Sequence, residues 1–300
     1  MVKRRIQLRN VANVAVGKTT LIDLPCGPRY HAIFLEHGNA HATNTVATAA
    51  ANITEIRIKI NGRVQRTMSG TQLRDMNLLN GASYDGTGTP NDAPGVCLPI
   101  FFAEPWRKSP ADQDALAWPS AGFSSFQIEV DLGSTLSPTL VASAAVDDMQ
   151  VNKLTGIVKW LRQSFASSGS SFDISTIDRR DWLQQISLYP AGYSPGLTVP
   201  GTAVAAGVLA TKVTLRKDGL ILHELTKSAN LGLVTNYGMS PSQTVRGPGI
   251  YDLVLDHDDL LGSAVQMDAA RDIVLTVESA TGSSMSGTLT AIVQRFGPPE

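Results

Sequence analysis

The sequence repeats itself. A run of alternating apolar and polar residues, a turn dipeptide and a short apolar-periodic segment occur at 56–80 and again at 213–236, about 157 residues later. The turn dipeptides are Asn61-Gly62 and Asp218-Gly219. Asn-Gly or Asp-Gly between alternating residues is the strongest short-range hairpin signal, because a type I′ turn needs positive φ at both central positions. Both copies therefore predict a tight β-hairpin followed by a short helix.

The flanks of the two hairpins correspond as well. Five further apolar segments of the first half have counterparts in the second half, in the same order and at nearly constant spacing. The pairs are 21–24 with 172–174, 32–35 with 185–188, 95–102 with 249–255, 126–132 with 272–278, and 140–142 with 289–291. A repeat of this length predicts two similar domains in tandem, which suits a building block better than a catalyst.

Strand patterns dominate the chain. About eight short alternating segments, separated by turn-rich stretches, indicate a β-sandwich or barrel in the first half. We predict Thr71 and Ser228 as the N-caps of the two short helices. The segment 159–165 fits helical spacing too, but we expect a strand there because the matching segment of the first half is one. The length of 300 residues fits two domains of ordinary size, which we place at 1–148 and 149–300.

The composition is poor in charge. Only 17% of the residues are charged, the net charge is −1, and the mean hydropathy is +0.00. Either uncharged polar residues cover the surface or neighbouring subunits bury much of it, and the duplication favours the second interpretation. No overall basic field exists to attract nucleic acid, so we expect no direct sequence-specific nucleic-acid binding.

Four basic residues stand near the N-terminus: Lys3, Arg4, Arg5 and Arg9. They are either a solvated terminus or a contact with an anionic surface, which is phospholipid or nucleic acid. Two cysteines, Cys26 and Cys97, are too few for a disulfide framework, and no secretory signal is visible, so we expect free thiols. No 18-residue apolar segment is visible, so we expect no membrane span. The Ala/Thr-rich run 42–51 is expected to be a loop or a small helix.

Candidate catalytic and metal-binding patterns are weak. The segment Gly17-Lys-Thr-Thr lacks the earlier glycine of a phosphate-binding loop and precedes a strand pattern. His31, His37 and His41 are expected to be loop residues, because Gly38-Asn39 lies between the last two. Three aspartates, Asp256, Asp258 and Asp259, form a weak candidate for a structural Ca²⁺ site, although a helix N-terminus explains them equally well. We expect no other metal and no cofactor.

Hydrolase signatures are also missing. The segment 282–287 does not have the Gly-x-Ser-x-Gly spacing of a nucleophile elbow and lies in an expected hairpin. Four tryptophans could line a sugar-binding groove but more often anchor a core or an interface; they are Trp106, Trp118, Trp160 and Trp182. The sequence therefore predicts a protein that is not an enzyme.

Several segments resemble the major capsid proteins of corticoviruses. In the first half they are 13–17, 24–27 with Tyr30, Ile33 and Leu35, and 56–63 followed by Thr71, Leu73 and Asp75. The second half keeps the order with Trp160-Leu161, Asp218-Gly219 and 230–237. The resemblance covers most of the chain, is strongest in residues 1–80, and is weaker in the long loops.

This resemblance implies a double jelly-roll coat protein of a tailless, icosahedral, membrane-containing double-stranded DNA phage. The expected fold class is all-β, with two tandem jelly-roll β-sandwiches and short helices in the loops. Three subunits would form a homotrimer with six similar lobes, a pseudo-hexagonal capsomer, and closed symmetry would limit growth to that unit. The expected location is the virion capsid, assembled in the cytoplasm of the host bacterium.

The resemblance also implies partners. They are neighbouring capsomers, a vertex (penton or spike) protein and the inner viral lipid membrane, which we expect to face Lys3, Arg4, Arg5 and Arg9. Four long loops, 80–95, 105–122, 192–207 and 235–249, are expected to include the top of the capsomer and some contacts between subunits. The alternatives are a tandem β-sandwich lectin or receptor-binding spike protein, and a β-sandwich hydrolase.

Overall fold

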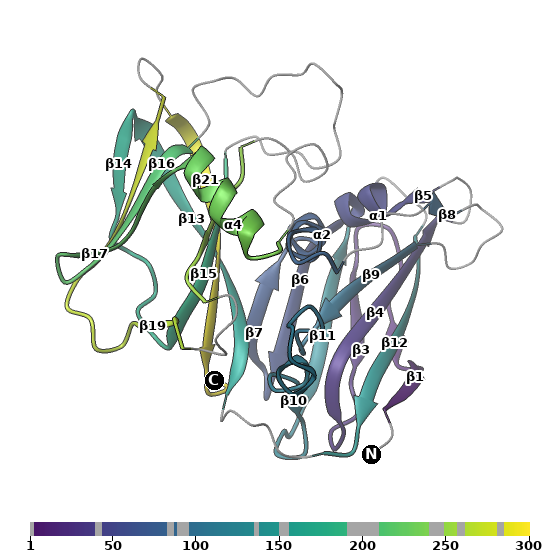
Figure 1. Cartoon of the computed structure of the whole chain (residues 1–300). Helices are drawn as coiled ribbons and strands as arrows, with labels where there is room; N and C mark the ends of the chain where they lie inside the picture. The colour runs from purple at the N-terminus through teal and green to yellow at the C-terminus, as the bar shows by residue number, and fades with distance from the viewer. Residues whose placement is uncertain are drawn as a thin grey trace. The chain divides into compact units, whose positions relative to one another are not determined.

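The computed structural model describes residues 3–39, 44–82, 87–88, 96–134, 138–149, 156–190, 210–239, 249–256, 262–280 and 285–300. The chain divides into two compact units (Figure 1). The first contains residues 1–158 and 298–300, and the second contains residues 159–297. The boundary that we expect from the sequence, at 148/149, lies beside residues 150–155, which are outside the described residues.

The first unit is a sandwich of two antiparallel sheets. One sheet has the order β1-β12-β4-β10, with β9 also paired to β4, and the other contains β7-β6-β11-β3-β2. The strands are β1 (Arg4–Leu8), β2 (Val11–Ala12), β3 (Thr19–Asp23), β4 (Arg29–Asn39), β6 (Ile53–Ile60), β7 (Arg63–Met68), β9 (Val96–Phe101), β10 (Trp118–Pro119), β11 (Phe126–Leu132) and β12 (Pro138–Asp147). A small ladder joins β5 (Asn44–Thr45) to β8 (Thr87–Gly88).

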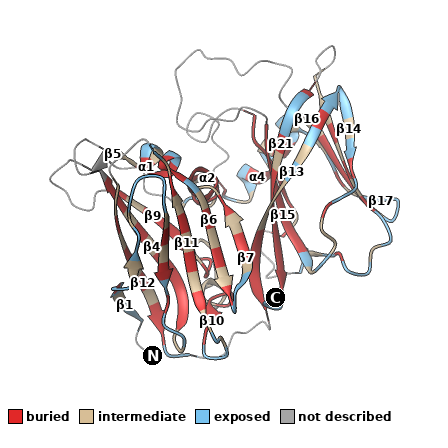
Figure 2. Ribbon diagram, turned by 180° about the vertical axis from the view of Figure 1, so that it is seen from behind, coloured by how far each residue is buried: buried red, intermediate tan, exposed pale blue. Residues whose placement is uncertain are grey.

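The core of the first unit follows from the alternation along its strands (Figure 2). In β6, Ile56, Ile58 and Ile60 are fully buried while the residues between them are half-buried on the opposite face. Tyr30, Phe102, Trp118 and Phe126 make edge-to-face and tilted ring contacts, with centroids 4.5–6.4 Å apart.

One arginine lies within this aromatic core. Arg66 of β7 is 1% exposed, and its guanidinium carbon is 4.9 Å from the ring centroid of Trp118 and 5.4 Å from that of Phe102. Its side chain donates hydrogen bonds to the backbone carbonyls of Val158 and Phe101. Burial lowers the pKa of Arg66 to about 9. No sequence signal marks this residue, because arginine in an alternating strand normally faces solvent.

Within its described residues, the first unit contains the helices α1 (Val46–Asn52), α2 (Gly70–Leu79) and α3 (Pro110–Gln113). The N-cap of α2 is Ser69, not Thr71 as the sequence predicts, because Ser69 and Gln72 form a capping box. The prediction missed this box, since it placed the start at the first residue of the apolar period. Helices α1 and α2 approach closely at Gly70, where an added Cβ would lie 2.5 Å from the backbone oxygen of Ala50.

The second unit repeats this construction. One sheet contains β18-β15-β21-β13, with β19 also paired to β15, and the other is β14-β20-β16-β17. The elements are β13 (Ile157–Gly169), β14 (Ser171–Ile174), β15 (Trp182–Tyr189), β16 (Ala210–Lys217), β17 (Leu220–Thr226), α4 (Lys227–Asn236), β18 (Tyr251–Val254), β19 (Val265–Gln266), β20 (Ile273–Ser279) and β21 (Met285–Gly297). The N-cap of α4 is Thr226, which corrects the predicted Ser228, because the Thr226 hydroxyl accepts from the N–H of Ala229.

The strand orders of the two units correspond element by element. The order β3-β11-β6-β7 in the first unit matches β14-β20-β16-β17 in the second, and β1-β12-β4 with β9 and β10 matches β13-β21-β15 with β18 and β19. Every segment pair that the sequence comparison identified falls on one of these strand pairs. The predicted duplication is therefore confirmed, and we call the two units the first roll and the second roll.

Each roll has two distinct ends. In the first roll, α1 precedes β6 and α2 follows β7, so both helices lie at one end, and the Asn61-Gly62 turn lies at the other (Figure 1). In the second roll, α4 follows β17 at the end remote from the Asp218-Gly219 turn. We call these the helix end and the hairpin end of each roll.

Other local expectations have mixed outcomes. The ambiguous segment 159–165 is part of strand β13, and the run 42–51 contributes α1, whereas residues 41–43 lie outside the described residues. His31 and His37 lie in strand β4 and are buried, so their assignment to a loop was wrong; Gly38 and Asn39 continue that strand. His41 is outside the described residues. Among the helices that the structure describes, none has the length and apolar character needed to cross a bilayer.

Candidate functional site

The weak calcium candidate is only partly within the described residues. Asp256 is buried, its backbone N–H donates to the carbonyl oxygen of Gln184, and its carboxylate lies 3.4 Å from the Gln184 amide nitrogen. Asp258 and Asp259 lie outside the described residues. Among the described residues, no group of three histidine, cysteine, aspartate or glutamate side chains is arranged to hold a metal ion.

The two predicted turns have the same backbone conformation. Asn61 and Gly62 have φ of 51° and 79°, and Asp218 and Gly219 have φ of 52° and 82°. Each pair joins two antiparallel strands, β6 to β7 and β16 to β17. Positive φ at both central positions is the conformation that type I′ hairpin turns require.

The first turn residue also fixes a neighbouring strand. Asn61 Oδ1 accepts hydrogen bonds from the backbone N–H groups of Ser124 and Ser125, at 2.7 and 3.2 Å, and from the Ser124 hydroxyl at 2.8 Å. Asp218 Oδ1 accepts from the N–H groups of Arg271 and Asp272 at 2.8 and 2.9 Å. In each roll the accepting side chain therefore holds the start of the strand beside the hairpin, β11 or β20.

Lys3, Arg4 and Arg5 lie at the hairpin end of the first roll, whereas Arg9 follows β1 farther along the sheet. Lys3 Nζ lies 2.8 Å from Asp114 Oδ1, and Arg4 Nη2 lies 2.5 Å from Asp148 Oδ1. Arg5 and Arg9 are exposed. Strand β1 pairs with β12, and its alternation buries Leu8 in the sheet while Arg5 and Gln7 remain exposed.

Behind these exposed pairs lies a buried ionic cluster centred on Asp147. The Asp147 side chain is completely buried and accepts from Arg29 at 3.1 and 2.7 Å, from His31 Nε2 at 2.7 Å and from the N–H of Met149 at 2.9 Å. His31 Nδ1 lies 3.1 Å from Asp114. Burial alone would raise the pKa of Asp147, but the hydrogen bonds from Arg29 and His31 outweigh it and lower the pKa to about 2.

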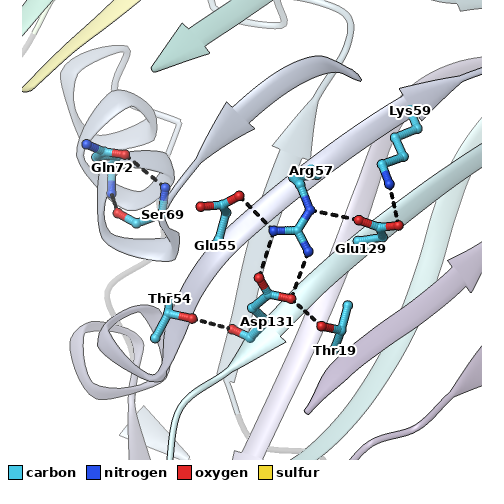
Figure 3. A network of polar contacts seen from close by, with 9 residues as sticks. All are labelled: Thr19, Thr54, Glu55, Arg57, Lys59, Ser69, Gln72, Glu129 and Asp131. Atoms are coloured by element: carbon cyan, nitrogen blue, oxygen red, sulfur yellow. Dashed lines mark hydrogen bonds and ion pairs between the residues drawn. The ribbon is translucent and has the colours of Figure 1, made fainter. Parts of the chain in front are cut away.

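The outward face of the β6–β11–β3 sheet carries a network of paired charges (Figure 3). Arg57 donates to Asp131 at 2.7 and 2.9 Å, to Glu129 at 2.7 Å and to Glu55 at 2.7 Å. Lys59 lies 2.5 Å from Glu129, and the Thr19 hydroxyl donates to Asp131 at 2.6 Å. All of these carboxylates and cations are only 17–27% exposed.

The network is held by mutual pairing. The bidentate bond to Asp131 contributes most to raising the pKa of Arg57. Burial would raise the pKa of Glu129 and of Asp131. Hydrogen bonds from Lys59 and Arg57 lower the pKa of Glu129, and hydrogen bonds from Arg57 and Thr19 lower that of Asp131. The face therefore presents polar groups whose charges are already satisfied within one roll.

The matching face of the second roll is built in the same way. Lys212 of β16 pairs with Glu224 of β17 at 2.7 Å and with Glu278 of β20 at 3.4 Å. The Thr276 hydroxyl donates to Asp173 at 2.6 Å. In both rolls, therefore, a basic residue of β6 or β16 pairs with acids of a neighbouring strand.

The remaining candidates from the sequence are the tryptophans and the two cysteines. Trp118 and Trp160 are buried, Trp106 is half-buried and stacks edge-on against Phe101, and Trp182 is exposed, so the described tryptophans do not gather into one groove. Cys26 and Cys97 are free thiols, and burial raises the pKa of Cys97 to about 11.

Comparison with known proteins gives a consistent result. Residues 5–150 match the family described as viral coat protein P2 N-terminal domain. A sequence search of curated proteins gives no match. Among solved structures, the chain is similar to the major capsid protein P2 of bacteriophage PM2, with 19% identity, 99% of this chain and 97% of that chain covered, and a TM-score of 0.73.

Two more distant viruses show the same fold. The major capsid protein of Sulfolobus turreted icosahedral virus is 10% identical, with 100% of this chain and 98% of that chain covered and a TM-score of 0.68. The capsid structure of the virus PBCV-1 gives 11% identity, 98% and 93% coverage, and a TM-score of 0.64.

Two duplicated rolls with matching strand order, together with these likenesses, show that the chain has the double jelly-roll fold of these viral capsid proteins. The match of residues 5–150 to the viral coat protein P2 N-terminal domain agrees with this fold. The matched family and the similar structures are capsid proteins and not enzymes. They give no support to the lectin, spike or hydrolase alternatives.

Proposed function

We propose that this chain is the major capsid protein of an icosahedral, membrane-containing virus and that it assembles as a homotrimer. The observation that carries the proposal is the correspondence of the two rolls, strand by strand. Three copies of a chain with two similar rolls give six similar lobes, so a three-fold oligomer acquires a nearly hexagonal outline that packs a shell without gaps.

The charged sheet faces support contacts between copies. A face that is to be buried against another subunit must not carry unpaired charges, because an uncompensated buried charge costs several kcal/mol. On the outward face of the first roll, Arg57 and Lys59 are already paired with three carboxylates. Such a face can approach a second copy, or a neighbouring capsomer, without having to find new partners for its charges.

We further propose that the N-terminal side of the first roll faces the inner viral membrane. Arg5 and Arg9 are exposed there, next to the exposed ion pairs of Lys3 and Arg4. Each basic side chain near an anionic bilayer contributes about 1 kcal/mol, which decays within a Debye length. The remaining partners in this proposal are a vertex protein and neighbouring capsomers, with assembly in the host bacterial cytoplasm.

Size-exclusion chromatography with light scattering tests the oligomeric state. A trimer of the 31.9 kDa chain has a mass of about 96 kDa (3 × 31.9). A monodisperse monomer at micromolar concentration would refute the trimer.

Electron micrographs of particles from a triple variant, with Lys3, Arg4 and Arg5 replaced by Gln, test the membrane side: trimers should persist while membrane-filled particles become rare. Normal membrane-filled particles from this variant would refute the proposed orientation.

A further inference from the structure

Exposed apolar side chains gather at the hairpin ends of the rolls. Five large hydrophobic residues are exposed among those that the structure describes: Val16, Met149, Trp182, Leu220 and Ile221. Leu220 is 67% exposed, Ile221 48% and Trp182 40%. Isolated exposed hydrophobics need no explanation, but a cluster at one place indicates an interaction site.

Three of the five lie at the hairpin end of the second roll. Leu220 and Ile221 directly follow the Asp218-Gly219 turn, and this end of β17 is exposed in Figure 2. Trp182, the first residue of β15, pairs with Gln266 of β19. Lys217, the partner of Leu220 in the hairpin, donates from its Nζ to the carbonyl oxygen of Gln266 at 2.6 Å, so β19 links the hairpin to the start of β15.

The other two exposed residues, Met149 and Val16, lie at opposite ends of the first roll. Met149 follows Asp147 at the hairpin end of the first roll, and its N–H donates to that carboxylate. Val16 lies at the helix end, because the neighbouring Gly17 donates to Gly133, which in turn donates to Asn52 at the end of α1. Val16 is therefore a natural control at the opposite end of a roll.

The hairpin end of the second roll is nearly balanced in charge. Lys217 and Arg271 flank the tip, while Asp218 directs one carboxylate oxygen to the N–H groups of Arg271 and Asp272. Asp178 at this end is paired with Arg180 and lies 3.0 Å from Arg295. With little net charge, an occupant must be recognised mainly by apolar contact.

We propose that Leu220, Ile221 and Trp182 form a lipid-contacting tip that inserts into the interfacial region of a bilayer. A tryptophan beside protruding aliphatic residues, with Lys217 and Arg271 around them, is the residue combination that interfacial membrane segments use. In a shell of packed sandwiches, the sheet faces and edges contact neighbouring copies. The end of the roll is then the part that is left to contact a membrane beneath the shell.

The inference rests on the proposed function as a coat protein of a membrane-containing virus, and it adds a second, chemically different membrane contact. The hairpin end of the first roll offers the basic residues Lys3, Arg4 and Arg5, whose attraction requires anionic lipid. The tip of the second roll offers apolar residues, whose insertion does not depend on lipid charge. A trimer carries three tips, and linked weak contacts bind far more tightly than one.

Vesicle flotation with the purified full-length chain tests the proposal. The unsubstituted protein is expected to float with pure phosphatidylcholine vesicles. The double variant Leu220→Gln, Ile221→Gln should reduce the bound fraction at least about tenfold, since two side chains lose their apolar burial. The matched control Val16→Gln, at the helix end, should float like the unsubstituted protein.

Trp182 supplies a second readout that does not depend on affinity. Phosphatidylcholine with brominated acyl chains quenches tryptophans that enter the bilayer. Trp118 and Trp160 are buried, and Trp106 is half-buried against Phe101 in the first roll. We expect quenching in the unsubstituted protein and its loss in Trp182→Phe.

Three results would overturn the inference. The first is that the double variant floats as much as the unsubstituted protein. The second is that Val16→Gln loses as much vesicle binding as the double variant. The third is that the double variant no longer forms a trimer while the fraction of its chains that floats is unchanged. The last result would identify the tip as a contact between copies. A failure of the proposed function is recognised separately, because light scattering would then show that the unsubstituted protein is a monomer, whatever the vesicles show.

Discussion

Replacing Asp147 with asparagine should strongly destabilise the first roll. The substitution keeps the shape of the side chain but removes its charge from a site where the carboxylate is completely buried. Arg29, of which 6% of the side chain is exposed, then keeps its positive charge without its bidentate partner, and the hydrogen bonds from His31 and Met149 lose their ionised acceptor.

The magnitude follows from two estimates. The pKa of Asp147 falls from 3.8 to about 2, and at 1.36 kcal/mol per pH unit this favours the folded state by about 2.5 kcal/mol at neutral pH. Breaking a buried ion pair by removing one partner costs about 3–5 kcal/mol, because the remaining charge is not compensated. We therefore expect a loss of about 3–5 kcal/mol, or a melting temperature lower by about 6–20 °C for a unit of this size.

The effect should depend on pH in one direction. Because the folded-state pKa of Asp147 lies below its unfolded value, the stabilisation is complete above about pH 4 and is lost as the pH falls through about 2. The difference between Asp147→Asn and the unsubstituted protein should consequently shrink between pH 4 and pH 2.

Urea unfolding followed by tryptophan fluorescence at fixed protein concentration measures this difference, because Trp118 is buried in the core of the first roll. The matched control is Asp148→Asn, the same substitution one residue later. Asp148 also pairs with an arginine, Arg4, but its side chain is 75% exposed, so the expected loss is below about 1 kcal/mol. Equal effects of the two substitutions, or a loss below 1 kcal/mol for Asp147→Asn, would refute the reasoning.

Further substitutions test other parts of the rolls by the same urea unfolding. Asn61→Ala should cost about 1–3 kcal/mol, because it forces alanine into positive φ and removes the acceptor of three hydrogen bonds, and a cost below 0.5 kcal/mol would contradict this role. Arg66→Lys should cost at least about 2 kcal/mol, since an ammonium cannot reproduce the planar stacking and the two directed bonds of the guanidinium; an unchanged midpoint would count against it. Gly70→Ala should destabilise the protein by about 1–3 kcal/mol, because the added Cβ would collide with Ala50. Gly232→Ala, in the interior of α4 with open space around it, should stabilise the protein by about 0.5–1 kcal/mol. Effects of the same sign would refute the comparison.

The duplication, the strands and the two turns could be predicted because they depend on local signals. Alternation with period two identifies a strand, and Asn61-Gly62 and Asp218-Gly219 identify positive-φ turns without knowledge of the rest of the chain. The matching order of the segments in the two halves then predicted that the whole chain consists of two similar domains. The helix starts were missed by two residues at each helix, because Ser69 and Thr226 precede the apolar period.

The polar interior could not be predicted, because it depends on contacts between residues far apart in sequence. Asp147 meets Arg29 and His31 across 118 and 116 positions, and Arg66 contacts Val158 across 92. Nothing in the local sequence distinguishes these residues from solvent-exposed charges at strand ends. The basic N-terminal segment shows the same limit, since its composition is visible in the sequence but the pairing of Lys3 with Asp114 is not.

This pairing gives a physical meaning to the low charge content of the chain. A coat protein must bury its lateral surfaces in assembly, and a surface with few charges achieves this only if those charges do not require water. In both rolls, the charges on the outward sheet face are joined across neighbouring strands, Arg57 to Asp131 and Lys212 to Glu224. The exposed apolar residues, by contrast, are concentrated at the ends of the rolls and not on these faces. Under the proposed function, the faces with satisfied charges contact equivalent subunits and the end with protruding apolar side chains contacts lipid, so one sandwich would separate lateral assembly from attachment to the membrane.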